Sequence, residues 1–398
     1  MDITSDMNRS LPLLTRISDA VDLREWKWTE WTTVVPYWES LWYRSTSQSP
    51  FLHPAWVEAW LETFGPSLQP VVLLATTEAG DDALGCCIMT RRVEYVRGMP
   101  VRRVYLNTAG ENAADDVCIE YNDILARPEY KAEFVAQLIA RLKQSRVDQF
   151  VVSGVHDLET VNLLRSEWAS ATTCAPSTAP YVDLASIRQR HNDYERELSS
   201  NTRAQVRRSQ RLLEAESGAI RVERADTVSQ GLEFLRELAD LHQSRWTAKG
   251  QAGAFHSPHF SSFHRRLVER LLPPGGIDLL RVCAGERTVG ILYNYLVQRK
   301  VFFYQSGFTY SSDNRVKPGL VTHTEAINYY LGRGLDEYDF LAGDSQYKQS
   351  LGNAERQMQW LTFDGHTLRV RFMGQLKAAH SWMRRLASEV NLFWKREV

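Results

Sequence analysis

The stretch from Val301 to Gly352 constrains the fold more than any other part of the chain. Its residue types predict, in this order, a strand, a loop, a helix, a second strand and a short helix. Val301–Phe308 is rich in β-branched and aromatic residues, which is typical of a strand buried on both faces. The polar segment Thr309–Lys317 predicts a loop, and Leu335–Ala342 predicts the second strand.

A helix is predicted between these strands, starting at Pro318, whose missing N–H suits a first helical turn. Leu320, Thr324 and Ile327 then recur at helical spacing. A helix start presents unpaired N–H groups and a positive dipole end, which favours a phosphate. The sequence therefore indicates an anion site at Arg315 to Val321, although many such units bind nothing. No P-loop or dinucleotide fingerprint is present here, which disfavours ATP and dinucleotides.

Length and composition bound the class of protein. At 398 residues the chain suggests two domains. The 47 Lys and Arg nearly cancel the 48 Asp and Glu, so global charge does not indicate a nucleic-acid binder. The five cysteines lack C-x-x-C spacing, which fits the reduced thiols of a cytoplasmic protein. No apolar run approaches the roughly 20 residues of a membrane-spanning helix, so we expect no integral membrane segment.

The order of elements is repeated along the chain. Pro70–Arg92 predicts a hairpin, followed by a helix at Tyr130–Leu142 and a strand at Gln149–Val155. A second hairpin at Ile277–Gln298 precedes the strand, helix and strand described above. We therefore expect the fold class α/β (α+β), with two tandem modules, each a mixed and mostly antiparallel sheet flanked by helices. The expected ranges are a lead-in at 1–29, an N-terminal module at 30–185, a C-terminal module at 186–365, and a closing strand and basic amphipathic helix at 366–398.

Three further elements are expected. Phe51–Gly65 predicts a helix that stops at Gly65-Pro66. Asp364-Gly365 predicts the turn of a closing hairpin between Gln359–Phe363 and His366–Phe372. The basic tail helix is expected to pack on the body, with peripheral contact to an anionic membrane surface as the alternative.

An arginine-rich helix is predicted between the modules. Ser199, Ser200 or Asn201 can cap it. Arg203 and Arg207 fall one turn apart on one face, where their guanidinium groups can hold a phosphate or a carboxylate. The alternative is a solvated helix face neutralised by neighbouring glutamates.

Candidate catalytic residues follow the predicted second strand, at a strand end where open α/β sheets place ligands. Asp344 can accept a proton, Tyr347 can donate one, and Lys348 can balance phosphate or oxyanion charge. The alternatives are a helix cap for Asp344 and ordinary surface placement for Lys348.

Three histidines lie close together upstream, at His256, His259 and His264. No cysteine or HExxH pattern accompanies them, so we expect no metal site. The more promising polar and aromatic candidates are His242, Arg245, Trp246, Tyr304, Gln305 and Asp339.

Four segments carry a resemblance to a known family. They are YQSGF at Tyr304–Phe308, PGLVTHTEAI at Pro318–Ile327, GLDEYDFLAGDSQYKQSLG at Gly334–Gly352, and LHQSRWTAKGQAGAF at Leu241–Phe255. They resemble the GNAT-type acyltransferases of the cellulose-biosynthesis CelD class, which are related to the Fem aminoacyltransferases. The resemblance spans most of residues 50–352 and is most specific in the YDFLxGDxxYK segment.

The resemblance implies two tandem GNAT-like modules and direct transfer of an acyl group from a thioester to an amine or hydroxyl. Acyl-CoA is implied as co-substrate, with no tightly bound cofactor. In such folds the donor pyrophosphate lies on the loop before the main helix, here Asn314–Leu320 in the C-terminal module. The usual glycine-rich loop is replaced here by Arg315-Val316-Lys317-Pro318-Gly319. Backbone N–H groups near Tyr304–Ser306 would hold the oxyanion.

The predicted site residues fall into three groups, and Asp344 is the expected base, with His242 behind it. The catalytic group is Asp344, His242, Tyr347 and Lys348; the donor-binding group is Tyr304, Gln305, Ser306, Arg315, Lys317, Gly319 and Leu320; the acceptor-binding group is Arg203, Arg207, Arg245, Trp246 and Asp339.

Three functions remain open from the sequence. The first is acyl transfer from acyl-CoA to an amine or hydroxyl of a sugar, a polysaccharide precursor or a natural product. The second is aminoacyl transfer from aminoacyl-tRNA, which the arginine helix permits but the near-zero net charge does not favour. The third is a non-catalytic GNAT-like partner in envelope or polysaccharide assembly. Binding of a donor separates the third function from the other two.

Overall fold

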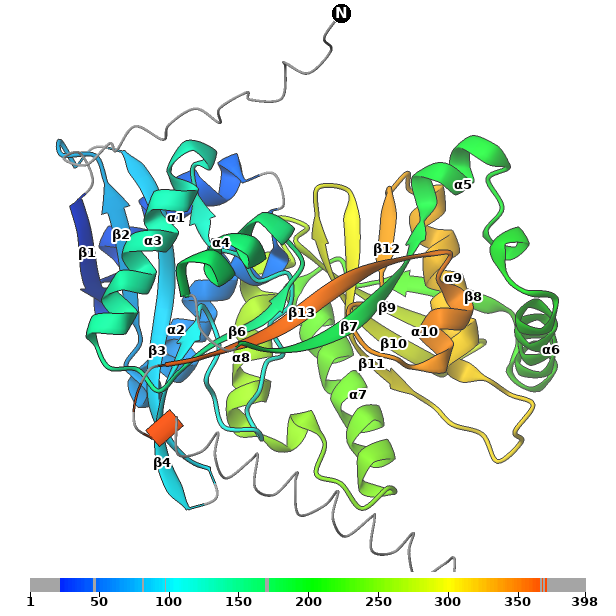
Figure 1. Cartoon of the computed structure of the whole chain (residues 1–398). Helices are drawn as coiled ribbons and strands as arrows, with labels where there is room; N and C mark the ends of the chain where they lie inside the picture. The colour runs from blue at the N-terminus through cyan, green and yellow to red at the C-terminus, as the bar shows by residue number, and fades with distance from the viewer. Residues whose placement is uncertain are drawn as a thin grey trace, which may run out of the picture.

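The computed structural model describes residues 22–45, 48–80, 82–96, 98–168, 172–365, 367, 369 and 370. Within these residues the strands form one mixed sheet of 13 strands. Helices lie on both faces of this sheet (Figure 1). The chain is therefore a layered α/β protein, as the sequence predicts.

The N-terminal part of the described chain alternates strands and helices. Its elements are β1 (Asp22–Lys27), α1 (Trp31–Arg44), α2 (Pro54–Leu68), β2 (Val71–Thr76), β3 (Ala83–Val96), β4 (Met99–Leu106), β5 (Leu125–Ala126), α3 (Pro128–Gln144), β6 (Gln149–Val155), α4 (Leu158–Trp168) and β7 (Thr172–Asp183), with short 3-10 helices at Trp28–Glu30 and Pro50–Leu52.

The C-terminal part repeats this alternation. Its elements are α5 (Leu184–Arg190), α6 (Ser200–Ser217), β8 (Ile220–Arg224), α7 (Val228–Thr247), α8 (Pro258–Leu271), β9 (Ile277–Ala284), β10 (Arg287–Val297), β11 (Lys300–Phe308), α9 (Pro318–Gly332), β12 (Glu337–Asp339), α10 (Gln346–Leu351) and β13 (Ala354–Asp364), with short 3-10 helices at Tyr194–Glu197 and Ala254–His256.

Neighbouring strands are antiparallel except in two places, where β4 lies parallel to β6 and β11 lies parallel to β12. In each half the two parallel strands are joined through a helix, α3 in the first and α9 in the second. This shared order supports the expectation of two related modules. The predicted fold class is confirmed.

The two halves exchange their last strands. The strand order is β1-β2-β3-β4-β6-β13-β7-β12-β11-β10-β9-β8, with β5 paired to β3. Strand β13 therefore lies beside β6 of the N-terminal half, and β7 lies beside β12 of the C-terminal half. The long strands β7 and β13 cross the middle of the molecule together (Figure 1). The module ranges 30–185 and 186–365 remain a prediction, but the sheet does not separate at residue 185.

Aromatic packing joins the halves on the face covered by α1, α2, α7 and α8. Trp56 of α2 is fully buried, and its ring lies 4.9 Å from the ring of Phe263 on α8 and 5.3 Å from that of Tyr295 on β10. Burial of large aromatic side chains dominates such interfaces. The tryptophan-rich helices thus hold the two halves together through the core.

Polar side chains fix the starts of two long helices. The Ser199 hydroxyl accepts a hydrogen bond from the Thr202 N–H (3.1 Å) at α6, and Thr227 accepts one from Gln230 (3.2 Å) at α7. Such caps satisfy the unpaired N–H groups of a first turn. The cap predicted for the arginine helix is therefore confirmed at Ser199.

Helix α2 does not stop at Gly65-Pro66, so that prediction is wrong. It continues to Leu68 and ends at Gln69, which has a left-handed backbone (φ 48°). A Cβ at Gly65 would lie 2.7 Å from the Trp28 ring. The glycine therefore serves close packing with Trp28 inside the helix, and not a helix end.

Three further predictions are corrected by the strands. Asp22–Lys27, expected in a loose lead-in, forms the edge strand β1, whose Leu23 and Trp26 pack into two different core clusters. The second strand of the opening stretch is shorter than predicted and covers only Glu337–Asp339. In the expected partner strand at 366–372, Arg369 and Val370 are helical.

The rest of that partner strand, apart from Thr367, and the tail helix lie outside the described residues. The same holds for residues 1–21 of the lead-in. Among the described helices, none combines the length and the apolar composition needed to cross a bilayer.

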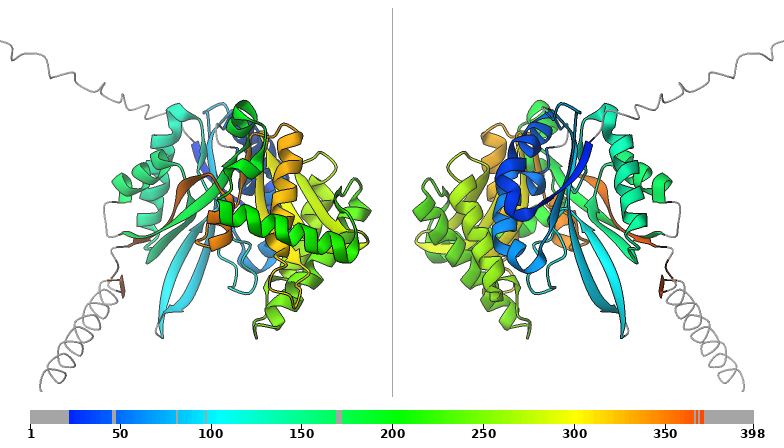
Figure 2. Two further views of the ribbon diagram at one scale, coloured as in Figure 1. Left: turned by 90° about the vertical axis from the view of Figure 1, so that its right-hand side faces the viewer. Right: turned by 90° about the vertical axis from the view of Figure 1, so that its left-hand side faces the viewer.

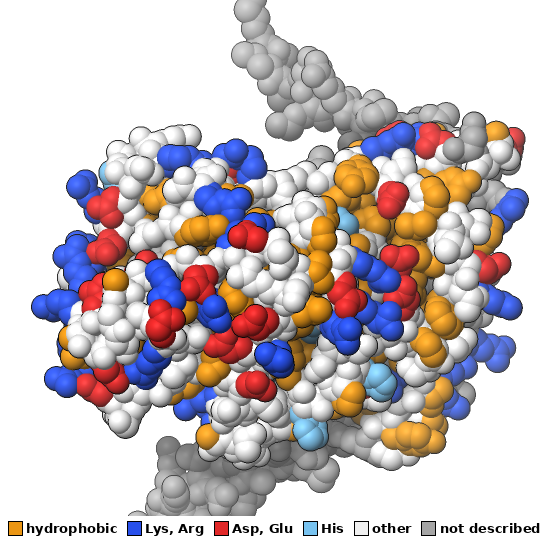
Figure 3. Space-filling model, turned by 180° about the vertical axis from the view of Figure 1, so that it is seen from behind, with side chains coloured by type: hydrophobic (Ala, Val, Ile, Leu, Met, Phe, Trp, Pro, Cys, Tyr) orange, Lys and Arg blue, Asp and Glu red, His pale blue; other side chains and the backbone are white. Residues whose placement is uncertain are grey.

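The outer surface carries charges of both signs. Strands β3 and β4 extend as a ribbon beyond the rest of the sheet (Figure 2), and Tyr95 near the tip of this ribbon is 77% exposed. Acidic and basic side chains are interspersed over the rear face (Figure 3). Among the described residues, the rear face therefore has no large patch of one charge.

Candidate active site

Strands β11 and β12 pair over a short distance and then separate. The parallel register runs from Lys300 and Glu337 to Phe302 and Asp339 and does not continue. The other edge of β11 pairs with β10 as far as Phe308. One edge of β11 is therefore open from residue 303 to residue 308, which leaves backbone groups free to bind a ligand.

The first cavity, called here the β11 cavity, borders the end of this strand. It has a volume of about 610 Å³ and is bounded by Gln305 and Ser306 of β11, by α7, by residues 251–257 and by part of the loop that follows β4. Elements from both halves of the chain thus build it. The other side chains that matter below are His242, Arg245, Trp246, Lys249, Phe308 and Tyr310.

His242 is a polar wall residue of the β11 cavity. It is 8% exposed and packs against Trp246 and Phe255, with ring centroids 5.7 Å and 5.4 Å away. Its Nδ1 has no hydrogen-bond partner among the described residues. Burial lowers the pKa of His242 to about 4, so the imidazole is neutral at physiological pH.

Two exposed cations lie at the edge of the β11 cavity on aromatic rings. The Arg245 guanidinium lies 4.3 Å from the centre of the Tyr310 ring, and the Lys249 ammonium lies 5.3 Å from that of Trp246. Cation–π contacts of this kind hold long side chains in place. The structure therefore brings the predicted residues His242, Arg245, Trp246, Gln305 and Ser306 to one cavity.

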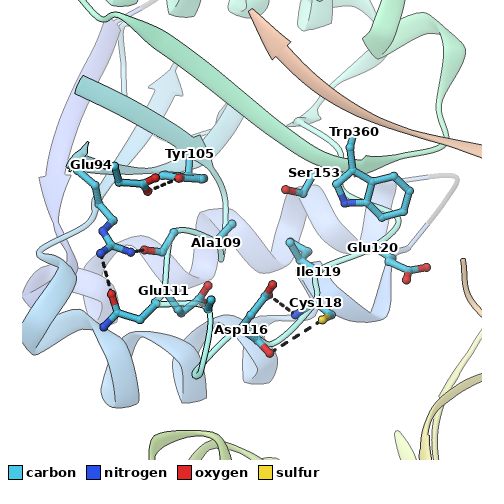
Figure 4. A pocket seen from close by; sticks show the side chains of 14 residues that line it. Glu94, Tyr105, Ala109, Glu111, Asp116, Cys118, Ile119, Glu120, Ser153 and Trp360 are labelled. Atoms are coloured by element: carbon cyan, nitrogen blue, oxygen red, sulfur yellow. Dashed lines mark hydrogen bonds between the residues drawn. The ribbon is translucent and has the colours of Figure 1, made fainter. Parts of the chain in front are cut away.

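Figure 4 shows a second cavity, called here the carboxylate cavity. Its volume is about 580 Å³, and it shares Ala113, Asp116 and Cys118 with the β11 cavity. The two cavities thus form one cleft between the halves. The carboxylate cavity is also lined by Arg92, Glu94, Tyr105, Glu111, Glu120, Ser153 and Trp360.

Glu111 and Glu120 are the carboxyl groups in this cavity whose pKa is raised. Glu111 accepts a hydrogen bond from the indole N–H of Trp60, and burial raises its pKa to about 8. Glu120 is 9% exposed, accepts a hydrogen bond from the Ala342 N–H (2.7 Å), and has a pKa raised to about 7, again by burial. Such values suit a general base at neutral pH.

The charges of Arg92 and Glu94 are engaged within the protein. Arg92 donates to the backbone oxygen of Gly110 and to Asn112. Glu94 accepts from Arg103 (2.6 Å) and from the Tyr105 hydroxyl. Glu111 and Glu120 are therefore better placed than Glu94 to act on a ligand.

Sequence reasoning missed both glutamates, because their partners are distant along the chain. Trp60 and Ala342 lie in elements far from the loop that carries Glu111 and Glu120. The available signal for Glu111 was the acidic run ENAADD (111–116), in the loop that follows β4.

The predicted catalytic residues after β12 lie outside this cleft. Asp344 is exposed and lines neither cavity. The Lys348 ammonium donates to the backbone oxygens of Leu341 (3.2 Å) and Ala342 (2.7 Å), and burial lowers its pKa. The Tyr347 ring stacks on His323 at 5.5 Å. These contacts are those of groups that hold a turn in place.

The predicted phosphate loop is partly occupied by protein. Arg315 forms an ion pair with Asp313 (2.7 Å), and the Lys317 N–H donates to the Ser209 hydroxyl of α6 (2.8 Å). The N–H groups of Gly319 and Leu320 have no hydrogen-bond partner among the described residues. The start of α9 thus keeps two of its first N–H groups free for an anion.

Four other predicted residues are held in structural contacts. The buried Tyr304 hydroxyl donates to the Val117 backbone oxygen (2.8 Å). Asp339 is fully buried and is bonded to Tyr121, Arg356 and the Leu341 N–H. The last two residues lie on α6, where Arg203 donates to the Leu198 backbone oxygen and Arg207 pairs with Glu195.

The three neighbouring histidines do not come together. His256 lies at the β11 cavity, His259 lies 3.5 Å from Asp115, and His264 is fully buried among aromatic rings. In the part of the chain that the structure describes, no group of three His, Cys, Asp or Glu side chains could hold a metal ion.

Comparison with known families gives a match to one part of the chain. Residues 200–349 match the model of the acetyltransferase (GNAT) domain family. The match covers α6 to α10, including β11, β12 and most of the β11 cavity. This part of the chain, in the C-terminal half, is therefore similar to a GNAT acetyltransferase domain. A search of curated proteins found no match.

Solved structures share the fold over nearly the whole chain. A conserved protein of unknown function from Bacteroides thetaiotaomicron has a TM-score of 0.51 at 8% identity, covering 86% of this chain and 99% of that one. The C-terminal DUF2156 domain of a putative lysylphosphatidylglycerol synthetase from Agrobacterium fabrum has a TM-score of 0.50 at 8% identity, covering 87% and 96%. FemX has a TM-score of 0.50 at 9% identity, covering 76% and 90%.

Proposed function

We propose that the chain transfers an acyl group from acyl-CoA to an amine or hydroxyl of a sugar, a polysaccharide precursor or a natural product. The observation that carries this proposal is the open edge of β11 beside a cleft with two carboxyl groups of raised pKa. An acyl donor can hydrogen-bond along that edge as an added strand does. We further propose that the chain belongs to the CelD class of these acyltransferases.

Two features of the C-terminal half are assigned to the donor. The N–H groups of Gly319 and Leu320, with the exposed Arg315 and the partly buried Lys317 beside them, are assigned to the pyrophosphate. The Ser306 N–H, on the open edge of β11, is assigned to the thioester carbonyl. The reacting carbon then lies at the β11 cavity.

The acceptor enters the cleft from the carboxylate cavity. Its nitrogen or oxygen attacks the thioester carbon and gives a proton to Glu111, with Glu120 as the second candidate base. The carbonyl oxygen becomes the oxyanion of the tetrahedral intermediate. The oxyanion then collapses, the carbon–sulfur bond breaks, and the CoA thiolate leaves and takes a proton from solvent. His242 orients the acceptor as a neutral hydrogen-bonding group.

Glu111 and Glu120 replace Asp344 as the favoured bases in this proposal because they line the cleft with a raised pKa, whereas Asp344 lies outside it. Lys348 supports the site indirectly, since its ammonium donates to the backbone oxygen of Ala342, whose N–H binds Glu120. Arg245 and Trp246 keep the acceptor-binding role that the sequence indicates.

The test combines donor binding with turnover. Melting temperature is measured with acetyl-CoA, octanoyl-CoA and an aminoacyl-tRNA; a donor at 100 times its dissociation constant stabilises the fold by ~2.7 kcal/mol. Release of CoA thiol is then followed with the matched acceptors glucosamine and glucose. Stabilisation by an acyl-CoA supports the proposal. Absence of stabilisation by either acyl-CoA contradicts it.

Aminoacyl-tRNA is the second candidate donor. The arginines of α6 support it: Arg203, Arg207 and Arg211 lie along one helix that borders the start of α9 at Ser209. Stabilisation by the aminoacyl-tRNA alone would favour this Fem-like function. No stabilisation by any of the three donors would favour the non-catalytic partner.

A further inference from the structure

The Ser306 N–H is directed to the open edge of β11 and not toward β10, although Ser306 lies within the stretch of β11 that pairs with β10. Its register partner on β10 is Leu292, but its N–H donates instead to Oε1 of the Gln305 side chain (3.0 Å). On the opposite side, β12 has already separated from β11 after Phe302. The N–H therefore lies at the open edge, and the neighbouring side chain covers it.

The other end of the Gln305 carboxamide is free. Its Nε2 makes no hydrogen bond within the residues that the structure describes, and Gln305 and Ser306 both line the β11 cavity. A glutamine side chain has an acceptor and two donor hydrogens on one rotatable group. Gln305 thus satisfies the Ser306 N–H in the way a ligand carbonyl would, and keeps two donors unused.

We propose that Gln305 is both a displaceable cover and a second donor of the oxyanion site. Its oxygen occupies the Ser306 N–H until the thioester carbonyl takes that place, and its Nε2 donates to the same oxygen only when negative charge develops there in the transition state, so it adds nothing to the binding of the donor. The inference rests on the proposed acyl transfer and adds a residue and a sequence of events to it. It also explains why a β-strand interior carries a long amide side chain at an open edge.

During acyl transfer, the Ser306 N–H and the Gln305 Nε2 both donate hydrogen bonds to the carbonyl oxygen of the thioester. When the acceptor attacks, the carbonyl π electrons move onto oxygen, and this oxygen carries the charge until the carbon–sulfur bond breaks. Two preorganised N–H donors stabilise that charge more than one does. Before the donor binds, an uncovered N–H at the edge would be solvated, so the cover competes with the donor for one hydrogen bond.

Two substitutions of Gln305 distinguish the proposed covering of the Ser306 N–H from a merely structural role. Covering predicts that they change the affinity for the acyl donor in opposite directions. Gln305→Ala removes the competitor, and we expect the dissociation constant of acetyl-CoA to fall about fivefold, the equivalent of one neutral hydrogen bond. Gln305→Glu keeps the shape but covers the N–H with a carboxylate, a stronger acceptor, and we expect the constant to rise about tenfold. A side chain needed only for packing would weaken binding in both variants.

The measurement is calorimetric titration of acetyl-CoA into wild type, Gln305→Ala and Gln305→Glu. Roughly 1 M salt reduces the Debye length to about 3 Å, so the added charge of the glutamate does not act at long range on the donor phosphates. The matched controls are Gln189→Ala and Gln189→Glu, on the exposed side of α5. Melting curves check that each variant is folded.

Tighter binding by Gln305→Ala with weaker binding by Gln305→Glu supports the inference. Equal or same-direction changes overturn it while the proposed function stands, since wild type still binds the donor. Failure of wild type to bind acetyl-CoA and octanoyl-CoA overturns the proposed function and this inference with it.

Discussion

At the scale of single residues, burial changes what a carboxyl group can do. Glu111 lies half-buried against the Trp60 indole, and burial raises its pKa to about 8 from a usual value of 4.5. The role of Glu111 therefore comes from its surroundings and not from its local sequence.

Glu111→Gln should lower turnover by about 100-fold with the fold intact, because the amide still accepts the Trp60 hydrogen bond but cannot take a proton. In wild type the rate should rise with pH through about 8, as the carboxyl ionises. The pH profile of CoA release measures both effects. Glu355→Gln is the matched control, and an unchanged rate in Glu111→Gln would remove Glu111 from the mechanism.

The same raised pKa predicts how stability depends on pH. Between pH 4.5 and about 8 the folded protein holds a proton on Glu111 that the unfolded chain has lost. The contribution of this group therefore falls as pH rises through that window. Urea unfolding of wild type against Glu111→Gln should show a shallower fall in the variant. Parallel stability curves would contradict the assigned pKa.

Lys348→Met should cost stability more than it costs catalysis. The ammonium holds the backbone oxygens of Leu341 and Ala342 and faces Glu120, so its loss should lower the free energy of unfolding by about 1–3 kcal/mol. Urea unfolding and CoA release on the same samples measure the two effects. A 100-fold loss of turnover at unchanged stability would instead support the catalytic role predicted from the sequence.

At the scale of elements, close approach of α7 to β11 shapes the β11 cavity. A Cβ at Gly307 would lie 2.6 Å from the Leu238 backbone oxygen and 2.8 Å from the Leu241 side chain. Gly332, at the end of α9, has nothing within 4 Å of such a Cβ. Gly332 therefore has room for a methyl group, whereas Gly307 does not.

Gly307→Ala should lower the free energy of unfolding by about 1–3 kcal/mol, because β11 must move away from α7. Gly332→Ala should change it by less than about 0.5 kcal/mol or stabilise the helix slightly. Urea denaturation compares the two. Equal effects would show that α7 and β11 do not meet as closely as described.

Local signals predicted most elements, and long-range pairing explains the misses. The strand at Val301–Phe308 and the helix from Pro318 follow from side-chain types and spacing that act within a few residues. The continuation of α2 through Gly65 could not be predicted, because its cause is the Trp28 ring from another element. Glu111 was missed for the same reason, since Trp60 sets its environment.

At the scale of the whole molecule, the exchange of β7 and β13 ties the two halves into one sheet. Each half buries an edge that the other provides, and the cluster around Trp56 continues this contact through the helices. The repeated order of elements along the sequence indicates two modules. It could not indicate that the two halves exchange their last strands, β7 and β13. Which strands pair across a duplicated fold depends on geometry that no local pattern records.

The shared sheet predicts cooperative unfolding. Tryptophan fluorescence and far-ultraviolet circular dichroism should give coincident urea transitions, since neither half can unfold without exposing the edge of the other. Two separated transitions would show that the halves are independent despite the exchange.

The central claim is that an acyl-CoA binds along the open edge of β11. Hydrogen exchange of the backbone amides, measured with and without acetyl-CoA, tests it directly. The account predicts slower exchange in the segment that includes Ser306 and at the start of α9 around Gly319 and Leu320, with no change on the far side of the sheet in β1. Unchanged exchange in both segments at a saturating donor concentration would contradict it.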